Sequence, residues 1–183
     1  MSRLAPRLKN LLRRSRPVVA RSRKFFFEPL EQRALLAILT WIGDVDANWN
    51  TNSGGNTNWD TNTLPGDTDT LIFDGTGGNF TQTNDTAALN SYTLQFTAGG
   101  YTIGGNAISL DNAGTDISST TGANTINTPF TMVSDTTLDI GGSATLTTGG
   151  VMSGSGGLTK IGTGTLNLNA LNTYTGNNLI SAG

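Results

Sequence analysis

The sequence predicts an all-β protein built as a solenoid, and three observations favour this fold over a β-sandwich. From Tyr92 onward, apolar residues recur two positions apart, as in strands with one buried face. Aromatic residues make up only 7% of the chain, which is little for the core of a sandwich. Threonine and asparagine fill the outward positions, where stacked rungs would bring them into ladders.

Six apolar pairs mark the expected strands, and no helical period occurs after residue 40. Glycine pairs separate the strands, and we expect them to supply positive φ angles at the turns. The spacing of the apolar pairs is uneven, which indicates that loops of different length leave one stack. The apolar pairs are Leu94/Phe96, Tyr101/Ile103, Ile108/Leu110, Phe130/Met132, Leu138/Ile140 and Leu166/Leu168, and the glycine pairs are Gly99-Gly100, Gly104-Gly105, Gly141-Gly142, Gly149-Gly150 and Gly156-Gly157.

Composition excludes several classes of functional site. The chain has no cysteine and no histidine, which excludes disulfides, thiolate or imidazole metal ligands and histidine-activated nucleophiles. Asp44 and Asp46 begin like a calcium-binding loop, but Trp49 and Gly55 stand where an EF-hand needs glycine and glutamate. We therefore expect no metal, no cofactor and no enzymatic activity.

Charge divides the chain into two segments. Residues 1–33 hold ten basic residues and two glutamates, a net charge of +8, whereas residues 34–183 hold Lys160 and 11 aspartates, a net charge of −10. We interpret residues 1–40 as a basic export leader, either helical or disordered, that contacts the membrane or the export machinery transiently. No base-reading module accompanies the basic residues, so we expect no nucleic-acid partner.

A short motif lies within this leader. Leu30, Glu31, Arg33, Leu35 and Leu36 follow a run of three phenylalanines. They resemble the LEPR-XLL leader of large secreted planctomycete proteins, with Gln32 where proline is usual. The resemblance implies a protein that is secreted or located on the cell surface.

All three tryptophans lie in residues 41–75, a segment rich in Asn, Gly and Thr. We interpret this segment as an N-terminal cap, because the open end of a solenoid must be covered to stay soluble. Trp41, Trp49 and Trp59 would then form a small core. In the alternative interpretation, Trp49 and Trp59 are exposed and contact carbohydrate by stacking on sugar rings.

Aspartates in the same region support an enzymatic alternative. A carbohydrate-active solenoid would use two of Asp44, Asp46, Asp67 and Asp69 as acid and base, at roughly 5–10 Å in one groove. However, an aspartate that follows Pro-Gly, as Asp67 does, is usually a turn residue. We therefore favour a protein without catalytic activity.

The most patterned stretch, GGLTKIGTGTLNLNALNTYTG, begins at Gly156. Its signature positions are Gly156, Gly157, Leu158, Lys160, Gly162, Gly164, Thr165, Leu166 and Leu168, then Asn172, Thr173, Tyr174 and Gly176. Residues 156–183 thereby resemble the autotransporter-associated β-strand repeat. The resemblance implies that residues 76–183 form a right-handed parallel β-helix outside the cell, with Lys160 as part of the repeat pattern.

The sequence therefore predicts a secreted or cell-surface structural or adhesive segment, the N-terminal part of a longer repeat protein. We expect residues 158–183 to form parallel strands, with Leu166 and Leu168 pointing inward and Asn167 and Asn169 outward. An uncovered last rung would expose a strand edge. The expected partners are a surface polysaccharide, or other β-helix chains that pair through this rung.

Overall fold

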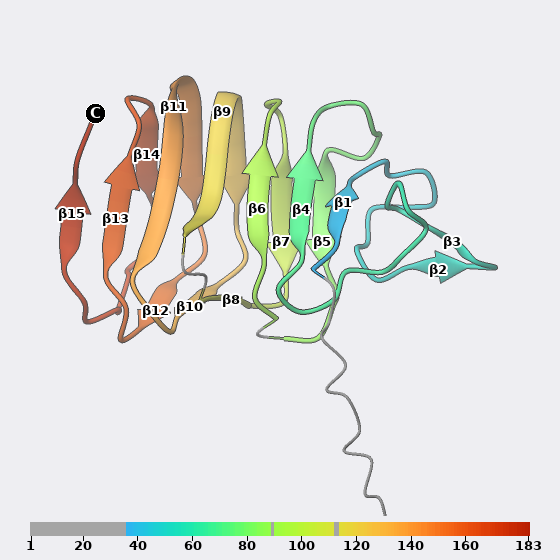
Figure 1. Ribbon diagram of the computed structural model, residues 1–183, viewed down its shortest axis with the longest axis horizontal. Coiled ribbons are helices and arrows are strands. Elements are labelled where there is room, and N and C mark those ends of the chain that lie inside the picture. Colours follow the sequence, from blue (N-terminus) through green and yellow to red (C-terminus); the bar gives the residue numbers. More distant parts are fainter. Residues whose placement is uncertain (1–35, 89, 112–113) are drawn as a thin grey trace, which may run out of the picture. The chain divides into compact units, whose positions relative to one another are not determined.

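The computed structural model in Figure 1 describes residues 36–88, 90–111 and 114–183. These residues form strands and turns without any helix, so none of them belongs to a helix able to cross a membrane. Most of the basic leader, including Leu30, Glu31, Arg33 and Leu35, lies outside the described residues. Leu36 is described and is exposed.

The strands stack in parallel as three walls, and long strands bend from the first wall into the second (Figure 1). The first wall runs β1 (Ile38–Thr40), β4 (Thr70–Phe73), β6 (Thr93–Phe96), β9 (Thr115–Ile126), β11 (Thr136–Thr148), β13 (Leu158–Ile161) and β15 (Asn178–Ile180). The second wall contains β5 (Thr81–Asn84), β7 (Thr102–Gly105), the later halves of β9 and β11, and β14 (Thr165–Leu168). The third contains β8 (Ile108–Leu110), β10 (Phe130–Met132) and β12 (Met152–Gly154). The chain is therefore an all-β parallel solenoid of about five turns, as the sequence predicts.

Strand register gives the length of one turn. In the first wall Leu71, Leu94, Ile117, Leu138, Lys160 and Ile180 lie in one inward column, with 20 to 23 residues between neighbours. Residues 158–183 continue this stack in parallel, as expected, because β13 and β14 pair with β11 and β15 pairs with β13. Turn length is thus nearly constant even though the apolar pairs are unevenly spaced along the sequence.

Side chains of one column pack directly on each other inside the stack. Phe73 and Phe96, partners in β4 and β6, stack with ring centroids 4.8 Å apart. On the third wall Ile108, Phe130 and Met152 are buried in register. The alternation of apolar and polar residues therefore places one face of most wall strands in a continuous narrow core, whereas β14 and β15 have no buried residue.

The corner glycines have two different roles. Gly100 and Gly105 adopt positive φ, as predicted, with values of 99° and 106°. The prediction is wrong for the pairs Gly141-Gly142, Gly149-Gly150 and Gly156-Gly157, which are absent from the positive-φ residues. At Gly150 and Gly156 a Cβ atom would overlap the carbonyl groups of Thr128 and Ser134 in the preceding turn. Glycine is needed at these corners because successive rungs approach each other closely.

Candidate interaction surfaces

The tryptophans lie in residues 41–62, between the rungs β1 and β4. We call these residues the Trp-rich insertion. This insertion also carries the antiparallel hairpin of β2 (Asn52–Ser53) and β3 (Asn56–Thr57), which projects beyond β1 in Figure 1. The indoles of Trp41, Trp49 and Trp59 are fully buried. The ring centroid of Trp59 lies 5.2 Å from that of Trp41 and 5.9 Å from that of Trp49. Both pairs pack edge to face.

The indole N–H groups of Trp49 and Trp59 also donate hydrogen bonds within the protein. The Trp49 Nε1 donates to Gln82 Oε1 at 2.9 Å, and the Trp59 Nε1 donates to the Trp49 carbonyl at 2.9 Å. A buried ring offers no face to a sugar, so the expected carbohydrate contacts of Trp49 and Trp59 do not fit this structure. The rings instead cover the N-terminal end of the core, where they pack on Phe73 and Tyr92.

The aspartates of the enzymatic alternative hold the backbone in place. Asp69 accepts hydrogen bonds from the backbone N–H groups of Ala37 and Gly66, each at 2.7 Å, and Asp67 accepts one from Ser91 at 2.7 Å. Ala37 and Ser91 belong to the turns on either side. These carboxylates therefore connect consecutive rungs, which explains why aspartate is placed beside Pro-Gly.

Asp46 is used in the same way inside the Trp-rich insertion. It accepts from the backbone N–H of Asn48, the hydroxyl of Thr51 and the side-chain amide of Asn58, each at 2.8 Å. The hydrogen bond from the Asn48 backbone is the main reason that the pKa of Asp46 lies below its ordinary value. Among the described residues, no group of three or more acidic side chains is placed to hold a metal ion.

The second wall displays a continuous column of hydroxyl groups on its outer face. Thr81, Thr102, Thr125 and Thr147 are partners in successive rungs, and Asn167 extends the column. We call these five residues the threonine column. They are half-buried or exposed, and neighbouring rungs of a parallel sheet lie about 4.8 Å apart. The column therefore presents evenly spaced polar groups along the solenoid axis.

Similar columns occur on the other walls. On the third wall Ser91, Ser109, Thr131 and Ser153 lie in register. On the first wall Thr115, Thr137 and Thr159 do so, and Leu179 completes the column. The sides of the solenoid thus carry further hydroxyl groups, although Ser91 and Ser109 of the third wall are buried. Lys160, the only basic residue after Arg33, does not contribute to them because it points inward.

Lys160 occupies the inward apolar column, between Leu138 and Ile180. Its side chain is only 7% exposed, and its ammonium donates to the carbonyl oxygens of Gly162 and Ala182, each at 2.8 Å. Burial of an ammonium is costly unless hydrogen bonds compensate it. The hydrogen bond from Lys160 to Ala182 therefore stabilises the position of the final residues against the preceding rung.

The last turn is the second candidate surface, and we call it the C-terminal face. Leu166 and Leu168 lie in register with the buried Leu146 and Thr148 and so point inward as predicted, but Leu168 is 39% exposed, since β14 pairs only with β11 among the described residues. Asn167 is exposed and its amide reaches the Thr147 hydroxyl at 3.4 Å. A pocket of about 150 Å³ opens there, lined by Leu158, Lys160, Leu166, Leu168, Asn178, Leu179 and Ile180.

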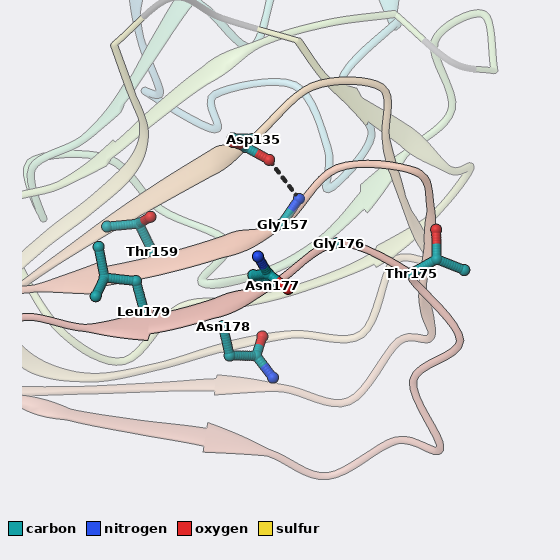
Figure 2. A pocket seen from close by; sticks show the side chains of 8 residues that line it. All are labelled: Asp135, Gly157, Thr159, Thr175, Gly176, Asn177, Asn178 and Leu179. Atoms are coloured by element: carbon teal, nitrogen blue, oxygen red, sulfur yellow. Dashed lines mark hydrogen bonds between the residues drawn. The ribbon is translucent and has the colours of Figure 1, made fainter.

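A larger groove of about 810 Å³ lies beside this face, at the corner that leads into β15 (Figure 2). Gly157 and Gly176 lie at its edge, where a Cβ atom on either residue would overlap the backbone of the neighbouring rung. Figure 2 shows Asp135 at one side, where its carboxylate accepts the Gly157 N–H at 2.7 Å. Thr159, Thr175, Asn177, Asn178 and Leu179 complete the lining. The groove offers neutral hydrogen-bonding groups and a single carboxylate.

The threonine column was missed by the sequence analysis, although a signal for it exists. Thr81, Thr102, Thr125 and Thr147 recur at intervals equal to the length of one turn. The apolar pairs conceal this interval because they come from three different walls.

Comparison with known proteins gives one partial match. No protein-family model matches the sequence, and no solved structure matches it. Over 115 residues, or 63% of its length, the chain is 31% identical to the adhesin BmaC autotransporter of Brucella suis biovar 1 (strain 1330). The chain spans only 3% of the length of that relative. This similarity and the parallel solenoid together fit an autotransporter-like repeat protein.

Proposed function

We propose that the chain is a secreted or cell-surface adhesive solenoid segment without catalytic activity, and that the threonine column is its adhesive surface. The observation that carries this proposal is the unbroken register of Thr81, Thr102, Thr125, Thr147 and Asn167 along the second wall. A row of evenly spaced hydroxyl groups suits a ligand that also repeats, because many weak hydrogen bonds then act together. The similarity to a bacterial adhesin supports the same role.

The ligand we propose is an uncharged polysaccharide. Residues 34–183 carry a net charge of −10, so an acidic polymer would be repelled, whereas a neutral one would exchange hydrogen bonds with the hydroxyl groups. The polar groove beside β15 supplies a further binding position for the same polymer. The buried Trp49 and Trp59 take no part.

An adhesion assay tests the proposal. Beads coated with the chain are expected to attach to insoluble cellulose or chitin. The triple variant Thr102→Val, Thr125→Val and Thr147→Val keeps the shape and β-propensity of the wall but removes three hydroxyl groups. Attachment should fall about tenfold or more, because each net hydrogen bond contributes about 1 kcal/mol.

A matched variant on the third wall, Thr131→Val with Ser153→Ala, should attach like the unchanged chain. Equal losses for both variants would argue against the threonine column as the adhesive surface. Attachment that is equally strong with a heat-unfolded chain would argue against an adhesive function altogether.

The finer identity is also a proposal. Residues 30–36 would act as an export leader of the LEPR-XLL kind, and residues 156–183 would be an autotransporter-associated repeat. A chain that starts at residue 41 should then stay inside the producing cell, while the full chain appears at its surface or outside. Equal export of both chains would contradict the role of residues 1–40.

A further inference from the structure

The outer face of the second wall carries no charged side chain in any rung that the structure describes. Lys160 and the 11 aspartates of residues 34–183 all lie outside the chain segments that build this wall. On the first wall, in contrast, Asp139 lies outward in register with Ser118 and Ile161. A ligand on the second wall therefore meets neutral side chains. The segments of this wall are residues 79–84, 100–105, 121–127, 143–149 and 163–169.

Small residues border the threonine column at its three middle rungs. In a strand, residues two positions apart lie on the same face, so the borders of a threonine are set by the residues two before and two after it. The small border residues are Gly100 and Gly104 at Thr102, Ala123 at Thr125 and Gly149 at Thr147. None of these four is buried, and a Cβ atom at Gly104 would meet only the Gln82 carbonyl oxygen, at 4.0 Å. Each middle rung is therefore open to a ligand on at least one side.

The direction of the column selects the shape of its ligand. Along the solenoid axis the side chains of the column follow each other at about 4.8 Å, the spacing of paired strands. An extended β-1,4-linked glycan is a straight ribbon in which each sugar ring is about as long as one such spacing. An α-1,4-linked glucan coils and turns its rings away from a straight row. The extended glycan therefore keeps successive rings over successive rungs, and the coiled one does not.

We propose that the threonine column binds an extended, neutral β-1,4-linked glycan lengthwise, with one sugar ring over each rung from Thr81 to Asn167. This inference deepens the proposed function and rests on it. Each ring exchanges a hydrogen bond with the hydroxyl or amide group of one rung in register. Every further rung therefore adds a contact to the same glycan chain, and many weak contacts act together.

A series of soluble oligosaccharides tests the lengthwise arrangement. NMR titration of the 183-residue chain with cello-oligosaccharides of two to six sugars measures the affinity for each length. The affinity should rise about fivefold with each added sugar up to five sugars, because each ring adds one net hydrogen bond. A sixth sugar should add little, since it finds no further rung of the threonine column. The α-1,4-linked five-sugar malto-oligosaccharide should bind no more tightly than the two-sugar cello-oligosaccharide.

Variants at the two ends of the column sharpen the test. Thr81 and Asn167 lie four rungs apart, about 19 Å along the axis. Thr81→Val and Asn167→Ala should each weaken binding of the five-sugar ligand about fivefold. Both should leave the two-sugar ligand nearly unchanged, because it can occupy the middle rungs. Thr137→Val, a matched change in the outward column of the first wall, should leave every length unchanged.

The outcomes separate this inference from the proposed function. If the chain attaches to insoluble cellulose but its affinity for cello-oligosaccharides does not rise with their length, the adhesive function stands and the lengthwise arrangement is overturned. Equal binding of the five-sugar malto-oligosaccharide would also overturn it, as would end variants that weaken all lengths equally. If neither the insoluble polymer nor any oligosaccharide binds, the proposed function fails together with the inference.

Discussion

The two ends of the described solenoid differ in how completely their strands are covered. At the N-terminal end, three fully buried tryptophans cover the core and Asp60 pairs with the edge of β1. At the C-terminal face, Leu179 and Ile180 are exposed and β15 has a strand on one side only. Both ends begin with the same inward column of aliphatic residues. The difference shows that an insertion between two rungs, and not a change in the rungs themselves, closes this solenoid.

The same difference between the two ends determines how much each end contributes to the free energy of unfolding. Each rung of a solenoid contacts only its neighbours, so the free energy of unfolding is approximately a sum of local contributions. The closed end combines aromatic packing with buried hydrogen bonds, whereas the last rung depends on one neighbour and on Lys160. We therefore expect substitutions to cost most at the N-terminal end.

The largest effect should come from opening the closed end. Trp59→Ala removes an indole that packs on Trp41 and Trp49 and donates to the Trp49 carbonyl. Loss of a buried aromatic side chain costs about 3–5 kcal/mol in the free energy of unfolding. Urea denaturation measures the loss.

The control for this prediction is Leu171→Ala, which alters a side chain that is 88% exposed and should change the free energy of unfolding by less than about 0.5 kcal/mol. If Trp59→Ala behaved like Leu171→Ala, the Trp-rich insertion would not stabilise the stack.

A smaller and local effect is expected at the open end. Lys160→Met keeps an unbranched side chain in the inward column but removes the donors to Gly162 and Ala182. We expect a loss of about 1–2 kcal/mol, confined to the last rung. Hydrogen exchange at the Ser181 amide, which donates to the Lys160 carbonyl, should become about tenfold faster.

Exchange at the Trp41 amide, which donates to the Ile72 carbonyl in the closed end, should stay as slow as in the unchanged chain. Faster exchange at both ends would mean that the two ends unfold together and that stability is not local.

The smallest effect should appear when acid is added, and it concerns the Trp-rich insertion. The folded pKa of Asp46 is lowered, chiefly by the hydrogen bond from the Asn48 backbone. Ionised Asp46 therefore stabilises the folded state fully at a pH above the unfolded pKa of an aspartate, about 3.9. This stabilisation is lost as the pH falls through the lower pKa that Asp46 has in the folded state. Asp46→Asn should reduce the acid sensitivity of tryptophan fluorescence without affecting the last rung. An unchanged acid transition would contradict this role.

Many strands of the solenoid could be predicted because the alternation of apolar and polar residues is visible in the local sequence. Alternation in Leu94/Phe96 and Phe130/Met132 marks strands with one buried face, and both pairs are buried in β6 and β10. Parallel strands were expected from the resemblance of residues 156–183 to the autotransporter-associated repeat. The length of a turn could not be obtained in the same way, because pairs from three walls follow one another along the chain and only the folded register separates them.

The candidate surfaces were less accessible to prediction. The sequence favoured a buried core for Trp49 and Trp59 but kept an exposed sugar-binding face as the alternative, since an indole serves both purposes. Only the packing of the insertion against Phe73 and Tyr92 removes them from the surface. The direction of the Lys160 side chain was not predicted either, because a lysine between a threonine and an isoleucine is compatible with either face of a strand.

The sequence by itself determined the strand type and the positions of glycine-containing turns such as Gly100 and Gly105, because these depend on neighbours two residues apart and on sterics at single positions. The parallel stack was expected only from the resemblance of residues 156–183 to a known repeat. Tertiary structure alone decided which residues meet across turns: the threonine column, the aspartate connections between rungs and the inward Lys160. These contacts join residues 20 to 32 positions apart, and that separation is set by loops whose length has no local signature.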